Sequence, residues 1–220
     1  MEPNFRRDEQ VAMQRISHTH AAIDARGMRP VLEGRHVTLR ALEPSDARSL
    51  HAFLTAPEVA RFISPPPATV EGFERFIART NRQQAAGKHA CFAVTLKGGH
   101  AAIGLFQIHA TEPGFRTAEW GFALGSPFWG TRVFQESAAL FLEFVFNTLG
   151  VHRLEGRVAV RNGRGGRALQ KLGAVQEGVL RKALLCNGQY LDQVLYAIVE
   201  DDWRASRDAS RQVAHTTMLH

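Results

Sequence analysis

One stretch of the chain, residues 117–174, alternates strand-like and helix-like patterns in the order strand, turn, helix, strand, turn, helix. Its letters are TAEWGFALGSPFWGTRVFQESAALFLEFVFNTLGVHRLEGRVAVRNGRGGRALQKLGA. Apolar residues recur at helical spacing from about Phe134 to Leu149, and Gly150 ends the helix. A strand that leads through a tight turn into a helix points free backbone N–H groups and the positive end of the helix dipole at one place. The pattern therefore predicts an anion site suited to a pyrophosphate.

The segments on either side predict further strands and helices. Two helices are expected before the stretch, one from Glu43 to about Leu54 and one from Thr69 to about Ala85. Asn187-Gly188 is a strong hairpin signal near the end of the chain. Alternating patterns predict strands over Val37–Leu42, Ala90–Leu96, Ala101–Ile108, Glu177–Cys186 and Gln189–Val199. This order predicts an α/β fold with a mixed, mostly antiparallel central sheet and helices on both faces.

Length and composition indicate one domain. Of the 220 residues, we expect 31–204 to form the domain, 1–30 an N-terminal extension and 205–220 a disordered C-terminal tail. No apolar run approaches the roughly 20 residues that span a bilayer, and the opening MEPNFRRDEQ lacks the apolar core of a secretory signal. Cys91 and Cys186 show no metal spacing and are expected to be core thiols. The predicted location is therefore cytoplasmic, with no membrane partner.

The charge distribution supports an anionic ligand. The chain carries 27 basic and 21 acidic residues, a formal net charge of +6. Between Thr131 and Lys182 nine residues are basic and four acidic, so five positive charges of the excess fall in the proposed anion-binding half. A polyanionic ligand would fit this surplus. A nucleic-acid patch or a solvated basic face would give the same count.

Four segments resemble one known family. They are AEWGFAL at 118–124, FWGTRVFQES at 128–137, LGVHRLEGRVAVRN at 149–162 and the stretch from Ala168 to Trp203. Together they resemble the acyl-CoA-binding core of the GNAT acetyltransferase superfamily, most closely its ribosomal-protein N-terminal acetyltransferase (RimJ/RimL-like) subgroup. The resemblance implies the GNAT fold, in which the fourth and fifth strands splay apart and admit the pantetheine arm. It also implies acetyl-CoA as co-substrate. The sequence contains no Cys/His cluster with metal-ligand spacing, so no metal site is expected.

The resemblance assigns a base and a proton donor. Glu119 is the expected base, and on its strand it shares a face with the small residues Gly121 and Ala123. The alternative is an exposed strand Glu that pairs with a neighbouring Arg. Tyr190 is a candidate to protonate the leaving thiolate, although a hairpin Tyr that only packs, as Tyr196 also would, stays open.

The resemblance also assigns the cofactor contacts. Backbone groups of Phe122 and Leu124 would meet the pantetheine amides. Asn162 would bind the pantetheine arm, cap the following helix, or do both. The turn from 129 to 134 would surround the pyrophosphate with Trp129, Gly130, Thr131, Arg132, Val133 and Phe134.

Two letters of that turn depart from the family pattern. Arg132 stands where the family has its second Gly, and Phe134 where it has a small residue. Either side chain would crowd the pyrophosphate, or Arg132 would pair with a phosphate.

We expect an N-acetyltransferase that acts on a primary amine, from a small molecule or a peptide. The alternative is a non-catalytic acyl-CoA-binding or nucleic-acid-binding module with a drifted phosphate turn. Nucleic acid is not among the expected partners of the enzyme, and a homodimer stays open.

Overall fold

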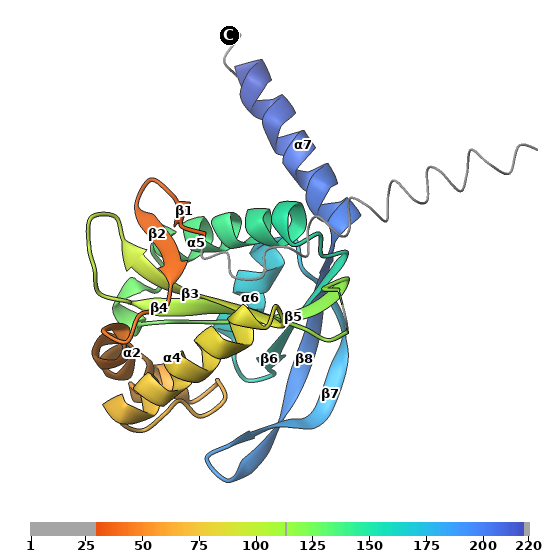
Figure 1. The fold of residues 1–220 in the computed structure, drawn as a ribbon. Helices are drawn as coiled ribbons and strands as arrows, with labels where there is room; N and C mark the ends of the chain where they lie inside the picture. The colour runs from red at the N-terminus through yellow and green to blue at the C-terminus, as the bar shows by residue number, and fades with distance from the viewer. Residues whose placement is uncertain (1–29, 113, 218–220) are drawn as a thin grey trace, which may run out of the picture.

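A computed structural model describes residues 30–112 and 114–217 of the chain. Within this part, eight strands form one sheet in the order β1-β2-β3-β4-β5-β6-β8-β7 (Figure 1). All neighbouring strands are antiparallel except β5 and β6. The strands are β1 (Leu32–Glu33), β2 (Val37–Ala41), β3 (His89–Leu96), β4 (Gly104–Ala110), β5 (Thr117–Leu124), β6 (Arg153–Ala159), β7 (Val175–Cys186) and β8 (Gln189–Val199).

Helices cover both faces of this sheet, with α5 on one face and α2 and α4 on the other (Figure 1). They are α2 (Asp46–Leu54), α3 (Pro57–Ala60), α4 (Val70–Ala85), α5 (Arg132–Glu143), α6 (Gly163–Lys171) and α7 (Glu200–Thr217), with a 3-10 turn η2 (Ser126–Phe128) and a π-helical turn η3 (Phe144–Thr148). None of the described helices has the length and apolarity needed to cross a membrane. The predicted fold class is confirmed.

The two cores follow from the alternation of side chains along the strands. Phe92 and Phe106 face α5 and contact Phe141 edge-on or tilted, at ring-centroid distances of 6.1 and 5.4 Å. Cys91 and Leu105 face the opposite way and join the cluster beneath α2 and α4. Burying each of these large side chains stabilises the fold by roughly 1.5–3 kcal/mol. Burial also raises the pKa of the Cys91 thiol, which agrees with its expected role as a core thiol.

Several element boundaries differ from the sequence expectation. Helix α5 begins two residues earlier than predicted, at Arg132, because Thr131 caps it. The disordered tail predicted from Ala205 is wrong over its first part, since α7 continues to Thr217. Its acidic first turn suits the helix dipole, and Trp203 anchors it by stacking on Phe146 at 4.8 Å. The predicted N-terminal extension lies outside the described residues up to residue 29.

Strands β5 and β6 separate part-way along their length. Their parallel pairing covers four residue pairs, from Thr117–Arg153 to Trp120–Gly156. Beyond that point β5 continues along β4 to Leu124, while β6 continues along β8 to Ala159. Since the short β1 was not among the expected strands, β5 and β6 are the expected fourth and fifth strands, and the splay that the family resemblance implied is present.

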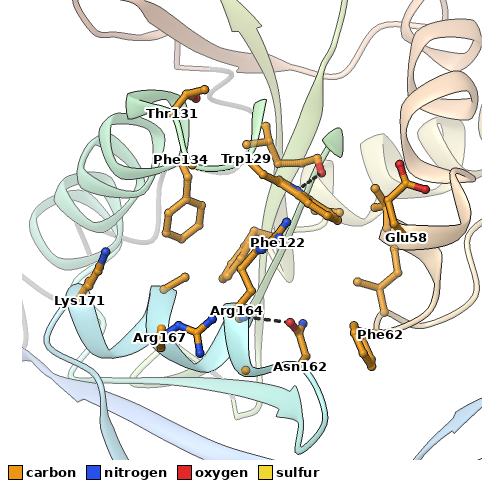
Figure 2. A pocket seen from close by; sticks show the side chains of 18 of the residues that line it. Glu58, Phe62, Phe122, Trp129, Thr131, Phe134, Asn162, Arg164, Arg167 and Lys171 are labelled. Atoms are coloured by element: carbon orange, nitrogen blue, oxygen red, sulfur yellow. Dashed lines mark hydrogen bonds between the residues drawn. The ribbon is translucent and has the colours of Figure 1, made fainter. Parts of the chain in front are cut away.

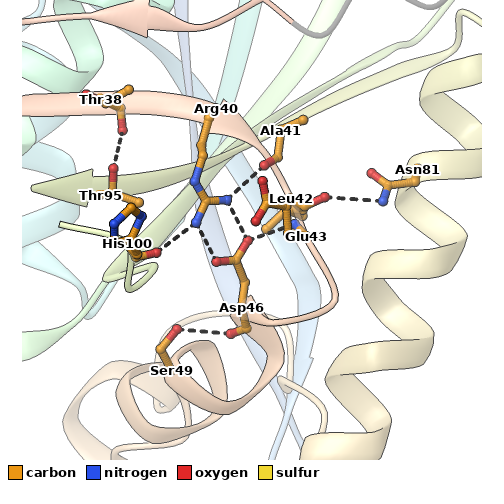
Figure 3. A network of polar contacts seen from close by, with 10 residues as sticks. All are labelled: Thr38, Arg40, Ala41, Leu42, Glu43, Asp46, Ser49, Asn81, Thr95 and His100. Carbon is orange, nitrogen blue, oxygen red and sulfur yellow. Dashed lines mark hydrogen bonds and ion pairs between the residues drawn. The ribbon is translucent and has the colours of Figure 1, made fainter. Parts of the chain in front are cut away.

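A buried ion pair fixes strand β2 to helix α2 (Figure 3). Arg40 at the end of β2 makes two hydrogen bonds to the Asp46 carboxylate, at 2.7 and 2.8 Å. The Arg40 side chain is 18% exposed and that of Asp46 is 2% exposed. Arg40 also donates to the carbonyls of Ala41 and His100, while Asp46 accepts from the backbone N–H of Glu43. Because both carboxylate oxygens of Asp46 and both Nη atoms of Arg40 are paired, the charges can be buried without a large net cost.

We predict that Asp46→Asn lowers the free energy of unfolding by about 3 kcal/mol, because the substitution leaves the Arg40 guanidinium buried without its counter-charge. Urea denaturation followed by circular dichroism measures the change. The matched control is Glu33→Gln, which removes an exposed partner of Lys97 and should leave the midpoint nearly unchanged. Equal midpoints for Asp46→Asn and the wild type would contradict this account of the network.

Candidate active site

The turn before α5 has the geometry of an anion site. Gly130 has a φ of 72°, in the left-handed region that favours glycine. The Thr131 hydroxyl donates to the Phe128 carbonyl at 2.7 Å and accepts from the backbone N–H of Val133 at 3.3 Å. One N–H of the first turn is thus satisfied within the helix end, and the others remain for a ligand.

The N-terminus of α6 lies across the same cavity. Asn162 caps this helix, because its side-chain oxygen accepts from the backbone N–H of Gly165 at 2.9 Å. The cavity between the two helix starts has a volume of about 600 Å³. Its lining contains one acidic residue, Glu58, and six basic ones, namely Arg61, Arg132, Arg161, Arg164, Arg167 and Lys171. A polyanion such as the pyrophosphate of CoA suits this charge and these free N–H groups.

Aromatic rings and one arginine form the wall of this cavity (Figure 2). The Trp129 indole donates to the Leu124 carbonyl at 2.8 Å, and the Arg164 guanidinium lies 4.1 Å from the centre of the Trp129 ring. This cation–π contact joins the start of α6 to the turn before α5. Phe134 packs against Phe122 with their centroids 4.8 Å apart. The unusual Phe at position 134 is therefore part of an aromatic wall.

The edge of β5 faces the gap that opens beside β6. Gly125 donates to the Ile103 carbonyl at 2.9 Å, in register with the β4–β5 ladder. Hydrogen-bonded and non-hydrogen-bonded pairs alternate in such a ladder. The N–H and C=O groups of Phe122 and Leu124 consequently point away from β4 and toward the gap. Since Trp129 occupies the Leu124 carbonyl, the groups left for pantetheine amides are those of Phe122 and the Leu124 N–H.

A second cavity, of about 560 Å³, lies next to the first. Its lining includes Glu119 and Gly121 of β5, His109 of β4 and Arg157 of β6. Both cavities share Phe62, Ile63, Phe122, Ala123, Asn162 and Gly165. Their common boundary is therefore the place where β5 and β6 diverge.

Glu119 is the acidic residue of the second cavity, and its side chain is 23% exposed. Its Oε2 lies 3.3 Å from Nη2 of Arg157 and 3.9 Å from Nε2 of His109. Glu119 thus has the strand Arg partner that the alternative interpretation required, and it also faces the cavity. An ion-paired carboxylate on a cavity wall can accept a proton from a bound amine.

The structure does not bring Tyr190 to this site. Tyr190 lies near the tip of the β7–β8 hairpin, is 64% exposed and lines neither cavity. Tyr196 is 5% exposed and packs beneath α6 beside Gly166. The predicted role of Tyr190 as proton donor is not supported by this geometry, because the hairpin extends past the sheet. Among the described residues no group of three His, Cys, Asp or Glu side chains is placed to hold a metal ion.

Sequence reasoning missed three contributors to the site. The stacking of Arg164 on Trp129 joins residues 35 positions apart and leaves no local pattern. His109 faces Glu119 across the β4–β5 ladder. The sequence could have indicated this pairing, because the number of residues in the connection between two antiparallel strands constrains their register. Phe62, after α3, reaches both cavities from a segment that carried no motif.

Comparisons with known proteins agree with this architecture. Residues 36–175 match the model of the acetyltransferase (GNAT) domain. The chain belongs to the GNAT family. It is an N-acetyltransferase, and GNAT acetyltransferases use acetyl-CoA.

Individual relatives share this family at low identity. YdaF of Bacillus subtilis (strain 168), which carries the name of a ribosomal N-acetyltransferase, is 24% identical over 176 residues, covering 78% of this chain and 96% of YdaF. The ribosomal protein uS5-alanine N-acetyltransferase of Escherichia coli (strain K12) is 29% identical over 93 residues, 42% of this chain and 48% of that enzyme. The structure of Mycobacterium smegmatis RimJ in complex with CoA-disulfide has a TM-score of 0.70 at 22% identity and covers 80% of this chain and 87% of that one.

We predict that Arg132→Gly weakens CoA binding about tenfold or more, although it restores the family letter. Arg132 is exposed at the first position of α5 and lines the first cavity. A guanidinium–phosphate pair there would contribute about 1.5–3 kcal/mol. Calorimetry with CoA at two salt concentrations measures the loss, which should shrink at high salt.

The control for this experiment is Arg75→Ala on α4, outside both cavities, which should bind CoA as the wild type does. Tighter binding by Arg132→Gly would mean that the side chain obstructs the turn instead.

Proposed function

We propose that the chain transfers the acetyl group of acetyl-CoA to the amino terminus of a peptide or protein, by direct attack of the amine on the thioester. The observation that carries this proposal is the junction of the two cavities at the β5–β6 gap. A basic cavity with two helix N-termini lies on one side, and Glu119 lies on the other. A thioester held in the gap would meet an amine beside the carboxylate.

The residues of the first cavity suit the parts of CoA. The turn from Trp129 to Arg132, which lines this cavity, would hold the pyrophosphate, with Arg132 and Arg164 as counter-charges. Val133, also expected there, is instead buried in the core, and its N–H is taken by Thr131. Phe122 and Leu124 would hold the pantetheine amides through their backbone groups. Acetyl-CoA supplies the activated acetyl group, and the protein need only position it, which contributes several kcal/mol to the barrier reduction.

The second cavity would receive the acceptor. Amide formation needs a neutral amine, so the ammonium must lose a proton before or during attack. Glu119 would accept this proton, and Arg157 beside it would disfavour a second positive charge in the site. Phe62, Phe76 and the Pro65–Pro67 segment give the cavity apolar walls for a flexible chain.

A peptide acceptor is supported by the relatives. The name of the uS5-alanine enzyme gives a ribosomal protein as its acceptor, and YdaF carries the name of a ribosomal N-acetyltransferase. A panel of peptides with free N-termini, the same peptides with blocked N-termini, and small amines tests the assignment by mass spectrometry. Acetylation of free-terminus peptides is expected, and acetylation of small amines alone would overturn the peptide assignment. Neither the family match nor the relatives give support to a non-catalytic binding module.

We predict that Glu119→Gln lowers kcat/KM for the best amine about 100-fold, within the range that a positioned base contributes. The loss should be greatest at low pH, where most of the amine is protonated, and the affinity for acetyl-CoA should stay unchanged. Initial rates of thiol release across the pH range, with CoA calorimetry, measure both effects.

Glu155→Gln is the matched control for this variant. Glu155 pairs with Glu119 in register on β6, binds Arg153 at 2.9 Å and lines neither cavity. It should retain the wild-type pH profile. If Glu119→Gln kept the wild-type rate at every pH, Glu119 would not be the base.

A further inference from the structure

We propose that His109 is a proton-relay residue, which takes the proton from Glu119 after amine attack and passes it to solvent. The inference rests on the proposed function, because it requires Glu119 to act as the base. It adds a second residue to the proton path that neither the motifs nor the family resemblance identified.

The sheet register brings the two side chains together. His109 on β4 and Glu119 on β5 are direct cross-strand partners, and such partners project from the same face of a sheet. His109 Nε2 lies 3.9 Å from Glu119 Oε2. One bridging water or a small side-chain rotation closes this distance.

His109 connects Glu119 to water. The His109 side chain is 50% exposed, whereas that of Glu119 is 23% exposed and is also held by Arg157. Both residues line the second cavity. A bound acceptor would fill part of this cavity and cover the carboxylate, and the half-exposed His109 would then give the proton a route to water along β4.

The groups around His109 come from three other strands. Glu119 on β5 lies 3.9 Å from its Nε2, and Arg157 on β6 pairs with the same carboxylate oxygen. His89, its partner on β3, has its pKa lowered to about 4 by burial and then by His109, with Arg79 of α4 contributing. His89 is therefore neutral at physiological pH and does not repel a proton on His109.

The amine proton passes through two side chains on its way to water. The amine nitrogen bonds to the acetyl carbonyl carbon, the C–S bond breaks with its electron pair on sulfur, and the amine proton passes to Glu119. Glu119 then gives this proton to Nε2 of His109. The imidazolium releases a ring proton to water and returns to the neutral form, leaving Glu119 ionised for the next amine.

The test is His109→Gln in the full chain, assayed with acetyl-CoA and the best amine of the panel. We expect kcat to fall about tenfold, less than the roughly 10²–10⁴-fold that a positioned base contributes, with KM for acetyl-CoA unchanged. Added imidazole should restore most of the rate in this variant, because a diffusing imidazole can take the proton from Glu119. The wild type should not respond to imidazole.

Two further variants complete the test. His109→Asn should behave like His109→Gln, and thermal melting of both confirms that they fold. His152→Gln changes an exposed His at the start of β6, outside both cavities, and should match the wild type.

The outcomes separate this proposal from the proposed function. A wild-type rate for His109→Gln at every imidazole concentration overturns the relay, as does a slow variant that imidazole does not rescue. Both results leave the acetyltransferase proposal standing. A wild type that acetylates no amine overturns the proposed function and the relay with it.

Discussion

The site depends on one constraint, the short parallel pairing between β5 and β6. Four residue pairs hold the strands together, and each strand then follows a different neighbour, β4 or β8. The backbone groups of Phe122 and Leu124 would be hidden in a longer ladder. In the splayed sheet they face the boundary between the two cavities instead. The small residues Gly121, Ala123 and Gly165 line the second cavity near this boundary and leave room for an extended ligand.

Charge is divided between the two sides of the gap. The first cavity combines helix N-termini with six basic side chains, so its positive potential attracts a polyanionic ligand over a long distance. The second cavity places a single carboxylate between Arg157 and His109. Two cationic or basic side chains beside one carboxylate disfavour an additional positive charge there. In the proposed function, the same fold would hold an anionic donor on one side and favour a neutral amine on the other.

Much of the fold could be predicted from the sequence, because local residue patterns determine where strands and helices begin and end. The segment Gln189–Val199 alternates cleanly and forms a strand with those same bounds, and the strand expected at the start of the stretch 117–174 forms over Thr117–Leu124. Thr69 and Asn162 carry side chains suited to helix caps, and both cap helices. The C-terminal helix was missed beyond Arg204, because its mean hydropathy is low and its anchor, Trp203 on Phe146, is a tertiary contact. Arg164, His109 and Phe62 were missed for the same reason, since each reaches the site through a partner distant in sequence.

The central claim is that the two cavities form one continuous site across the β5–β6 gap. The most direct measurement is the affinity of a bisubstrate compound in which the sulfur of CoA is joined through an acetyl bridge to the N-terminus of the best peptide acceptor. A linked ligand that occupies both cavities gains from the high effective concentration of its second half. We therefore expect calorimetry to show a Kd at least about 100-fold below that of CoA alone. A compound that binds no tighter than CoA would show that the peptide is not held beside the thioester, and would contradict the account.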